Sequence, residues 1–358
     1  MASNAPQRES LTHPESAALD FVLTLRKRWA DTVYPALHDE YRERVGAGPA
    51  PATRAEAARL VHDLELYPWF AWLERGSQKM LWRSANAAVG AHLAPVTRPA
   101  QPLGRLELDP ALALPDWYTA WDIHVQPGGV WRNAASAQVY ELGAQLVMLR
   151  ENDDYLFHRA FAETALPPRD YRCIVDLGCG FGKSTWPLKR AHPQAEVIGV
   201  DLAAPCLELA HQRSEAQGLA ITYLQRNACE TGLPAGSADL VTSTMLLHEM
   251  PPEAIAATLR EAARLLAPGG VLRMLDFQFS GQPFRDVAFA EHGVRNNEPF
   301  LPGLCELDMA ALCAQAGLRG GQWVAFDERG AGRLPTAAWP ERPEWHFPWA
   351  VLEAERAA

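Results

Sequence analysis

Apolar and polar residues alternate with two different periods along the chain, and the change comes near residue 165. Before it, apolar residues recur at the intervals of amphipathic helices, and proline-rich stretches interrupt them. Thr53 followed by Glu56 is the signature of a helix N-terminus. The pattern predicts a mainly helical domain over residues 1–165. Its clearest helical segments are residues 16–37 and 53–73, and its clearest breaks are residues 46–54 and 93–104.

After residue 165, short runs rich in β-forming residues alternate with helical segments. This alternation predicts a doubly wound, mostly parallel α/β sheet over residues 166–358. The last two runs have no helix between them, so we expect them to form an antiparallel hairpin at one edge of the sheet. The seven expected strands are residues 172–178, 195–202, 220–228, 238–246, 270–278, 320–328 and 347–355.

Composition and charge exclude several classes of function. The chain has 358 residues, 48% of them hydrophobic, and a net charge of −10, so neither half is a basic surface for nucleic acid. No apolar run approaches the roughly 20 residues that span a bilayer, and the first residues lack an apolar leader. We expect a cytoplasmic protein without nucleic-acid or membrane partners. The six cysteines show no CxxC pair, which predicts free thiols and no metal centre.

A glycine-rich turn, "IVDLGCGFGKST" at residues 174–185, follows the first expected strand. It is one position short of a P-loop, because only three residues separate Gly178 from Gly182. It also lacks the third glycine of the dinucleotide fingerprint, since Lys183 stands there. The remaining pattern is D-x-G-x-G-x-G, a turn that brings the backbone close to a polar ligand.

From Tyr171 to Ala358 the chain resembles the class I S-adenosylmethionine-dependent methyltransferases. The resemblance rests on "VDLGCGFG", "VIGVDLAAPCLELA", "YLQRNACETGLPAGSADLV", "LVTSTMLLHEM" and "EAARLLAPGGVLRMLDF", in that order. It implies that Asp176 reaches the cofactor ammonium group, that Asp201 accepts both ribose hydroxyls, and that Leu202 lies beside the adenine. Asn227 stands where the family usually has an acidic residue. The full set of implied cofactor residues is Asp176, Gly178, Cys179, Gly180, Gly182, Asp201, Leu202, Asn227, Ala228 and Met245.

Substrate groups are expected beyond the carboxyl ends of the strands and in the helical half that covers them. His248 follows the fourth strand and is a candidate base; the alternative is that it only hydrogen-bonds its loop. His124 lies before a Pro-Gly-Gly turn between two tryptophans, which suits a pocket wall, although a buried structural histidine is equally compatible. The catalytic candidates are His124, His248, Asn133 and Tyr140, and the substrate-binding candidates are Trp121, Trp131, Arg132, Arg295, Asn296 and Asn297.

These residues predict a methyltransferase for a small metabolite, of the kind found in secondary metabolism, with the helical half as a lid. A second hypothesis keeps the cofactor but transfers or cyclises its aminocarboxypropyl group, releasing methylthioadenosine. A third is a cofactor-binding protein without catalysis, which the intact glycines and Asp201 disfavour. The expected partners are the small-molecule substrate and, as an open expectation, a second copy of the chain in a homodimer.

Overall fold

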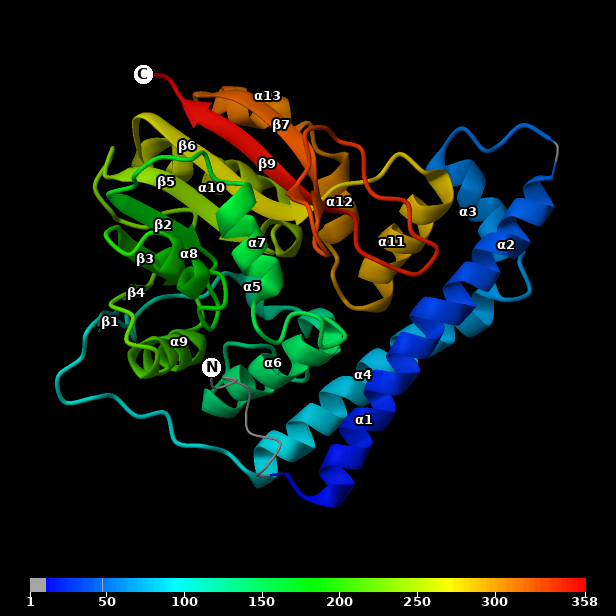
Figure 1. The fold of residues 1–358 in the computed structure, drawn as a ribbon, viewed down its shortest axis with the longest axis horizontal. Helices are drawn as coiled ribbons and strands as arrows, with labels where there is room; N and C mark the ends of the chain where they lie inside the picture. The colour runs from blue at the N-terminus through cyan, green and yellow to red at the C-terminus, as the bar shows by residue number, and fades with distance from the viewer. Residues whose placement is uncertain (1–10, 47) are drawn as a thin grey trace.

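The computed structural model describes residues 11–46 and 48–358 and shows a mixed sheet on one side of the molecule, with the N-terminal helices on the other (Figure 1). The sheet has nine strands within these ranges, in the order β1-β4-β3-β2-β5-β6-β9-β7-β8. The pairs from β1 to β6 are parallel, whereas β9 is antiparallel to both β6 and β7. The strands are β1 Arg105–Glu107, β2 Cys173–Leu177, β3 Glu196–Asp201, β4 Thr222–Gln225, β5 Ala238–Thr244, β6 Leu266–Phe277, β7 Leu318–Asp327, β8 Gly332–Arg333 and β9 Trp349–Arg356.

All seven expected strands are present, and β7 and β9 are antiparallel as predicted. The count of seven was too low, because β1 and β8 extend the two edges. Both are too short to show an alternating pattern in the sequence. β1 is placed by a close backbone approach, since a Cβ on Gly104 would overlap the carbonyl of Ile221. The segment before residue 165 therefore contributes one strand to the sheet.

Helices cover both faces of the sheet, which gives two hydrophobic cores. One core includes Trp186 and Leu207 from two of these helices, and the other includes Ile255 and Met309 from the helices opposite. Strand β2 is buried at every residue, as expected for a parallel strand covered on both sides. The covering helices are α8 Thr185–Ala191, α9 Ala204–Ala216, α10 Pro252–Leu265 and α13 Met309–Gln315.

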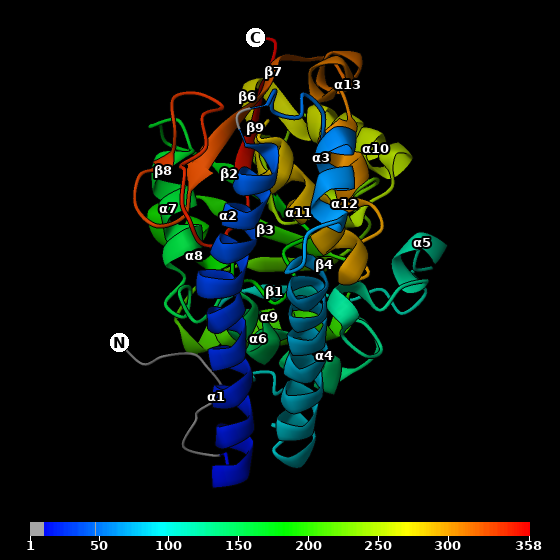
Figure 2. The ribbon, with the colours of Figure 1, turned by 90° about the vertical axis from the view of Figure 1, so that its right-hand side faces the viewer.

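The N-terminal helices form a long arm, in which α1 and α4 lie side by side (Figures 1 and 2). Thr53 caps α3 as predicted, accepting a hydrogen bond from the Glu56 amide. The expected helix over residues 53–73 is instead two helices, and at the break the Glu40 carboxylate accepts hydrogen bonds from the amides of Glu65 and Leu66. The arm comprises α1 His13–Arg28, a π-helical turn Trp29–Val33, α2 Tyr34–Val45, α3 Arg54–His62 and α4 Tyr67–Ala91.

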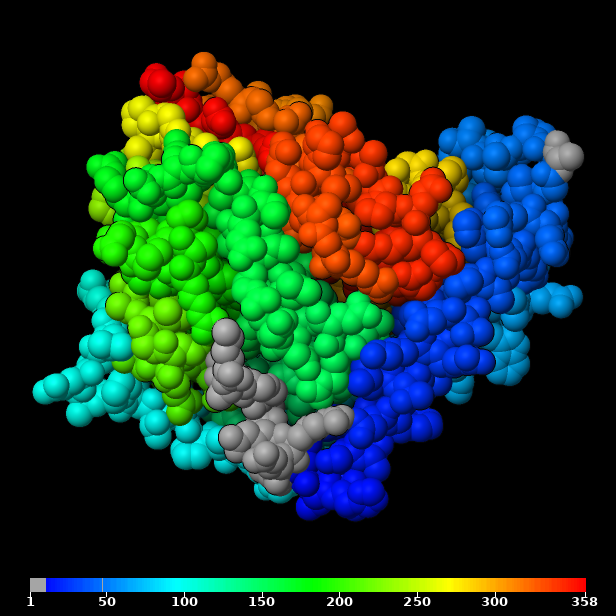
Figure 3. Space-filling view, in the orientation of Figure 1, coloured from blue at the N-terminus to red at the C-terminus, as the bar shows by residue number. Residues whose placement is uncertain are grey.

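The arm packs against the remainder of the molecule over much of its length (Figure 3). Glu74 of α4 is buried and pairs with Arg295 and His292, which joins the arm to the helix after β6. None of the described helices is both long and apolar enough to cross a bilayer. Residues 1–10, where no leader is expected, lie outside the described residues. The remaining helices are α5 Asp116–Thr119, α6 Ala134–Val147, α7 Leu156–Thr164, α11 Pro283–Arg295 and α12 Leu301–Glu306, with 3-10 turns at Ile123–Val125 and Leu247–Glu249.

Candidate active site

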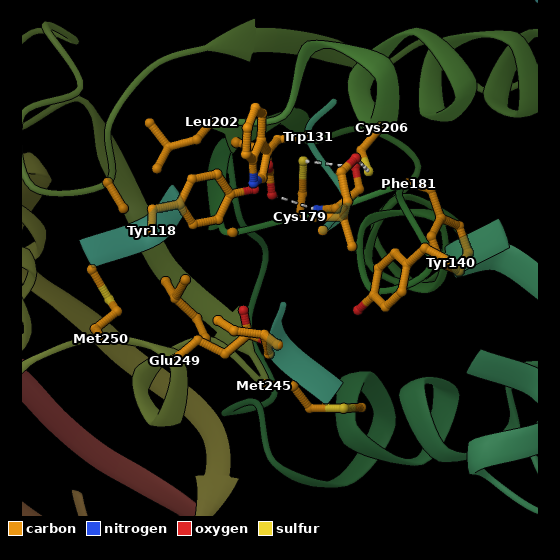
Figure 4. A pocket seen from close by; sticks show the side chains of 18 of the residues that line it. Tyr118, Trp131, Tyr140, Cys179, Phe181, Leu202, Cys206, Met245, Glu249 and Met250 are labelled. Atoms are coloured by element: carbon orange, nitrogen blue, oxygen red, sulfur yellow. Dashed lines mark hydrogen bonds between the residues drawn. The ribbon is translucent and has the colours of Figure 1, made fainter. Parts of the chain in front are cut away.

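A cavity with about 1080 Å³ of empty space opens at the carboxyl ends of β2, β3 and β5 (Figure 4). This is the position at which open parallel sheets bind ligands. Its wall combines the glycine turn with aromatic residues from the segment between β1 and α6, and we call it the cofactor cavity. Eight of the ten residues that the sequence implied for the cofactor line it: Gly178, Cys179, Gly180, Asp201, Leu202, Asn227, Ala228 and Met245.

The glycine turn is fastened to the neighbouring strand by its own backbone. The amides of Gly178 and Cys179 both donate to the carbonyl of Val200, at 2.8 and 3.1 Å. Gly180 has a φ of 52°, in the left-handed region that glycine adopts without strain. A Cβ at Gly180 would meet only the Tyr140 ring, at 3.7 Å, so a longer side chain would enter the cavity. The turn therefore leaves room for a ligand against the backbone.

Asp201 ends β3 with its carboxylate in the cavity wall. One oxygen accepts a hydrogen bond from the Gly180 amide and the other from the Ala203 amide, each at 2.8 Å. Burial raises the pKa of Asp201 to about 6, although the two amides oppose the shift. Each carboxylate oxygen retains a free lone pair for a ligand hydroxyl.

Asp176 and Gly182, the other two implied cofactor residues, do not line the cavity. The Asp176 carboxylate is fully buried and accepts hydrogen bonds from the hydroxyls of Ser184 and Thr185, both at 2.7 Å. A Cβ at Gly182 would lie 2.8 Å from the Trp186 indole nitrogen, so glycine is required there for packing. Both residues therefore contact the residues that follow the turn and not the cavity. The interaction of Asp176 with the cofactor ammonium group stays a prediction.

A second cavity of about 650 Å³ of empty space adjoins the first, and we call it the acceptor cavity. The helical half supplies Arg26 and Trp82, and the sheet supplies Phe277 and Trp349. Tyr140 points its hydroxyl toward the open centre of the cofactor cavity and also lines the acceptor cavity (Figure 4). The residues shared by both cavities are His124, Tyr140, Lys183, Met245 and Glu249.

Two histidines and three carboxylates gather where the cavities meet. His124 Nδ1 lies 2.8 Å from Glu298 Oε1, and its Nε2 lies 3.0 Å from Glu249 Oε1. His248 Nδ1 lies 2.8 Å from Asp276 Oδ1. Burial would lower the pKa of His124, but the charge of Glu298 and the hydrogen bonds to both glutamates raise it to about 10. His124 therefore holds its proton near neutral pH, which makes it a poor general base.

The pKa of His248 is also raised. Burial opposes protonation, whereas the charge of Asp276 and its hydrogen bond favour it. The structure therefore brings the two catalytic candidate histidines together, with ring centroids 6.3 Å apart. The two histidines differ in their hydrogen bonds. Both ring nitrogens of His124 lie within hydrogen-bond distance of a carboxylate, whereas only Nδ1 of His248 does.

The other candidates divide between the cavities and the scaffold. Trp121 and Trp131, which were predicted to bind the substrate, line the cofactor cavity and not the acceptor cavity, so their role in substrate binding stays a prediction. Asn133 lines neither described cavity: its side chain accepts from the Ser136 amide and caps α6. Arg132 is exposed, with its guanidinium carbon 5.6 Å from the Trp131 ring centre.

Arg295, Asn296 and Asn297, the substrate-binding candidates after β6, line neither cavity, whereas His292 and Glu298 of the same segment line the acceptor cavity. Arg295 pairs with Glu74 and Glu291, and so holds the arm in place. Asn296 is fully buried and donates to the His292 carbonyl, while Asn297 donates to the Asp122 carbonyl at 3.3 Å. Arg295 and Asn297 thus contact the N-terminal half, whereas Asn296 bonds within its own segment. Their polarity, which suggested substrate binding, is explained by these contacts.

Sequence reasoning missed several cavity residues. Tyr118 and Trp117 come from a segment without clear periodicity, and Arg26 lies on the apolar stripe of a helix. Glu298 was noted only as one polar residue in a loop. The one signal available was Arg26 itself, a charged residue at a helix position that the pattern places inside the core.

Comparison with known proteins supports the same cofactor site. Residues 174–270, from β2 into β6, match the family model described as "Methyltransferase domain". These residues form a class I methyltransferase domain. Its cofactor is S-adenosylmethionine. The model does not extend to the helical half, so the match covers the cofactor side of the site.

Relatives and solved structures share only part of the chain. A demethylmenaquinone methyltransferase of Thermus thermophilus is 36% identical over 124 residues, covering 35% of this chain and 55% of the relative. A trans-aconitate 2-methyltransferase of Azoarcus is 37% identical over 107 residues, covering 30% of this chain and 40% of the relative. The phosphoethanolamine N-methyltransferase 2 of Haemonchus contortus, solved with S-adenosyl-L-methionine, overlaps 54% of this chain and 50% of its own at 15% identity and a TM-score of 0.39.

The chain thus spans 55% and 40% of the lengths of the two relatives. Both are named as methyltransferases of small molecules, and neither is named for aminocarboxypropyl transfer. Nothing in these comparisons supports that alternative.

Proposed function

We propose that the protein transfers the methyl group of S-adenosylmethionine to a small molecule held in the acceptor cavity. One observation carries the proposal: the cofactor cavity of the methyltransferase domain continues into a second, largely apolar cavity under the helical half. Met245 and Glu249 stand in the wall common to both. A methyl donor in the first cavity would meet its acceptor at this junction, shielded from water.

The residues of the first cavity fit the cofactor. Gly180 leaves space against the turn, and the Asp201 carboxylate faces the cavity with lone pairs for ribose hydroxyls. Asn227 and Ala228 line the part of the wall assigned to the adenine. The bound cofactor supplies an electrophilic methyl group, and the chain needs to hold it in line with the acceptor.

The walls of the second cavity suggest the chemistry of the acceptor. Trp82, Phe277 and Trp349 are buried and present aromatic surface. Arg26 is only 4% exposed, donates to Gln78 Oε1 at 2.6 Å, and leaves its Nε without a partner among the described residues. The Trp82 indole nitrogen also has no hydrogen-bond partner among the described residues. An acceptor with an apolar, flat body and an anionic or carbonyl group would satisfy both donors.

Residues 1–165 act as the lid in this proposal, because Arg26, Trp82 and Tyr140 all come from them. An acceptor with a hydroxyl or ammonium group also has to lose a proton. His248 is the better base of the two histidines, since Asp276 orients it and one ring nitrogen is not held by a short hydrogen bond. A homodimer and a cytoplasmic location stay predictions.

Product analysis tests the proposed reaction. The full chain is incubated with S-adenosylmethionine and an unfractionated metabolite extract, and the cofactor product is identified by mass spectrometry. We expect S-adenosylhomocysteine and a metabolite heavier by one methyl group. The matched control is Gly180→Val, whose branched side chain would occupy the cofactor cavity. Methylthioadenosine as the product, or no turnover above this control, would refute methyl transfer.

A further inference from the structure

His124, His248 and Glu249 converge on one point at the junction of the cavities. Each offers one ligand atom, and the three atoms lie within 4.8 Å of one another. Glu249 Oε1 is 3.0 Å from His124 Nε2 and 3.9 Å from His248 Nε2. Two imidazoles and one carboxylate are a common ligand set for divalent transition metals in proteins. The cysteine spacing, which gave no sign of a metal, does not bear on this cluster.

The outer nitrogen of each histidine is already engaged. His124 Nδ1 is 2.8 Å from Glu298, and His248 Nδ1 is 2.8 Å from Asp276. Both carboxylates are buried. Histidine ligands of metals usually donate their second N–H to such a carboxylate, which fixes the ring and directs the other nitrogen to the ion. The arrangement of both rings therefore matches that of metal ligands together with their outer hydrogen-bond partners.

Two of the three separations are close to those of a metal site, and the third, between the two histidine nitrogens, lies within 4.8 Å. Bonds of about 2.1 Å at angles between right-angled and tetrahedral place two ligand atoms about 3.0–3.4 Å apart. The pair His124–Glu249 is within this range, and His248–Glu249 would close by a few tenths of an ångström through rotation of the Glu249 side chain. In the metal-free protein a proton on His124 joins it to Glu249, and metal binding would displace that proton.

We propose that His124, His248 and Glu249 bind one divalent transition-metal ion of the Zn²⁺ type. Three carboxylates surround the two imidazoles, so a dication would offset two of the three negative charges. Because all three ligands line the acceptor cavity, the open coordination positions face it. Resting on the proposed function, an acceptor oxygen, nitrogen or sulfur atom would bind there and lose its proton more readily. In the metal-bound protein the ion would replace His248 in promoting this proton loss, because the free nitrogen of His248 is then a ligand.

Zinc binding is measured on the full chain without substrate or cofactor. The protein is stripped with a chelator and titrated with Zn²⁺ by calorimetry, and Co²⁺ absorption reports the ligand geometry. We expect one ion per chain, with affinity at least tenfold weaker in His124→Gln and in Glu249→Gln. Glu298→Gln keeps all three ligand atoms and should weaken binding about tenfold to hundredfold, as loss of an outer partner does. Circular dichroism checks that each variant is folded.

The matched control is His62→Gln. His62 also pairs with a glutamate, Glu291, but lies on the arm with its side chain 51% exposed. Binding equal to that of the wild type is expected for this control. The proposal is overturned if the wild type binds no more Zn²⁺ than His124→Gln, or if His62→Gln loses binding equally. Loss of the zinc proposal would leave methyl transfer unaffected. Zinc binding without any methyl transfer would contradict the proposed function and leave the zinc site standing.

Discussion

Replacing Asp201 with alanine should weaken S-adenosylmethionine binding by about 1.5–3 kcal/mol, a factor of about 10 to 150 in Kd. The carboxylate already accepts one backbone amide on each oxygen, at 2.8 Å, which fixes its plane against the glycine turn. The remaining lone pairs face the cavity, where charge-assisted hydrogen bonds to two ribose hydroxyls are worth more than neutral ones. Calorimetry at neutral pH measures the loss.

The pH dependence of cofactor affinity shows whether the negative charge of Asp201, and not only the size of its side chain, contributes to binding. Its pKa is about 6 in the protein, so the carboxylate is ionised at pH 7.5 and increasingly protonated below pH 6. The ionised form accepts the hydroxyls, so affinity should fall as pH falls, by up to tenfold per unit below the pKa. Asp201→Asn, which does not titrate, should bind weakly at pH 7.5 and show no further loss through Asp201 at pH 5.

Asp239→Ala is the matched control. Its carboxylate also accepts two backbone amides, those of Arg172 and Cys173, but at the opposite end of the sheet. Loss of those bonds should lower stability without changing cofactor affinity. An unchanged Kd for Asp201→Ala, or an equal loss for Asp239→Ala, would remove Asp201 from the ribose site.

Three further substitutions test residues of the N-terminal half. Arg26→Gln should raise KM for the acceptor tenfold or more while leaving S-adenosylmethionine affinity unchanged, since Arg26 lines the acceptor cavity and not the cofactor cavity; steady-state kinetics and cofactor calorimetry measure the two effects. Asn133→Ala should lower stability by about 1 kcal/mol through loss of the α6 cap, with kcat retained, and a large fall in kcat would show that Asn133 has a direct role. Gly143→Ala should lower the melting temperature markedly, because its Cβ would overlap the Trp82 ring; an unchanged Tm would mean that α4 and α6 can separate without cost.

The cofactor half of the site was predictable because its determinants are local. The glycine turn and Asp201 follow successive strands, and adjacent parallel strands bring their carboxyl ends together. The strands were evident as buried apolar runs. Gly182 and Asp176 were assigned to the cofactor because they lie in the glycine turn. In the structure, Gly182 packs against Trp186, and the Asp176 carboxylate accepts hydrogen bonds from two hydroxyls outside the cavity.

The acceptor half was not predictable from spacing. Arg26, Trp82, His248 and Trp349 are far apart in the sequence and meet only when the arm packs on the sheet. Asn133 shows a second limit: asparagine is favoured both in ligand pockets and at helix N-termini, and the sequence alone does not distinguish these uses. The edge strand β1 is a third case, since three residues carry too little pattern to be recognised.

The position of the family match explains why the relatives do not identify the acceptor. Residues 174–270 build the cofactor side, whereas Arg26, Trp82 and Tyr140 come from before this range and Trp349 from after it. Under the proposed function, specificity for the acceptor would be encoded mainly outside the matched domain, in the arm, in α6 and in the C-terminal strand. Two proteins that share the matched domain can keep the same donor geometry and differ entirely in this second cavity. Exchanging arm residues should change the acceptor while cofactor affinity stays nearly constant, because the two cavities have separate walls except at their junction.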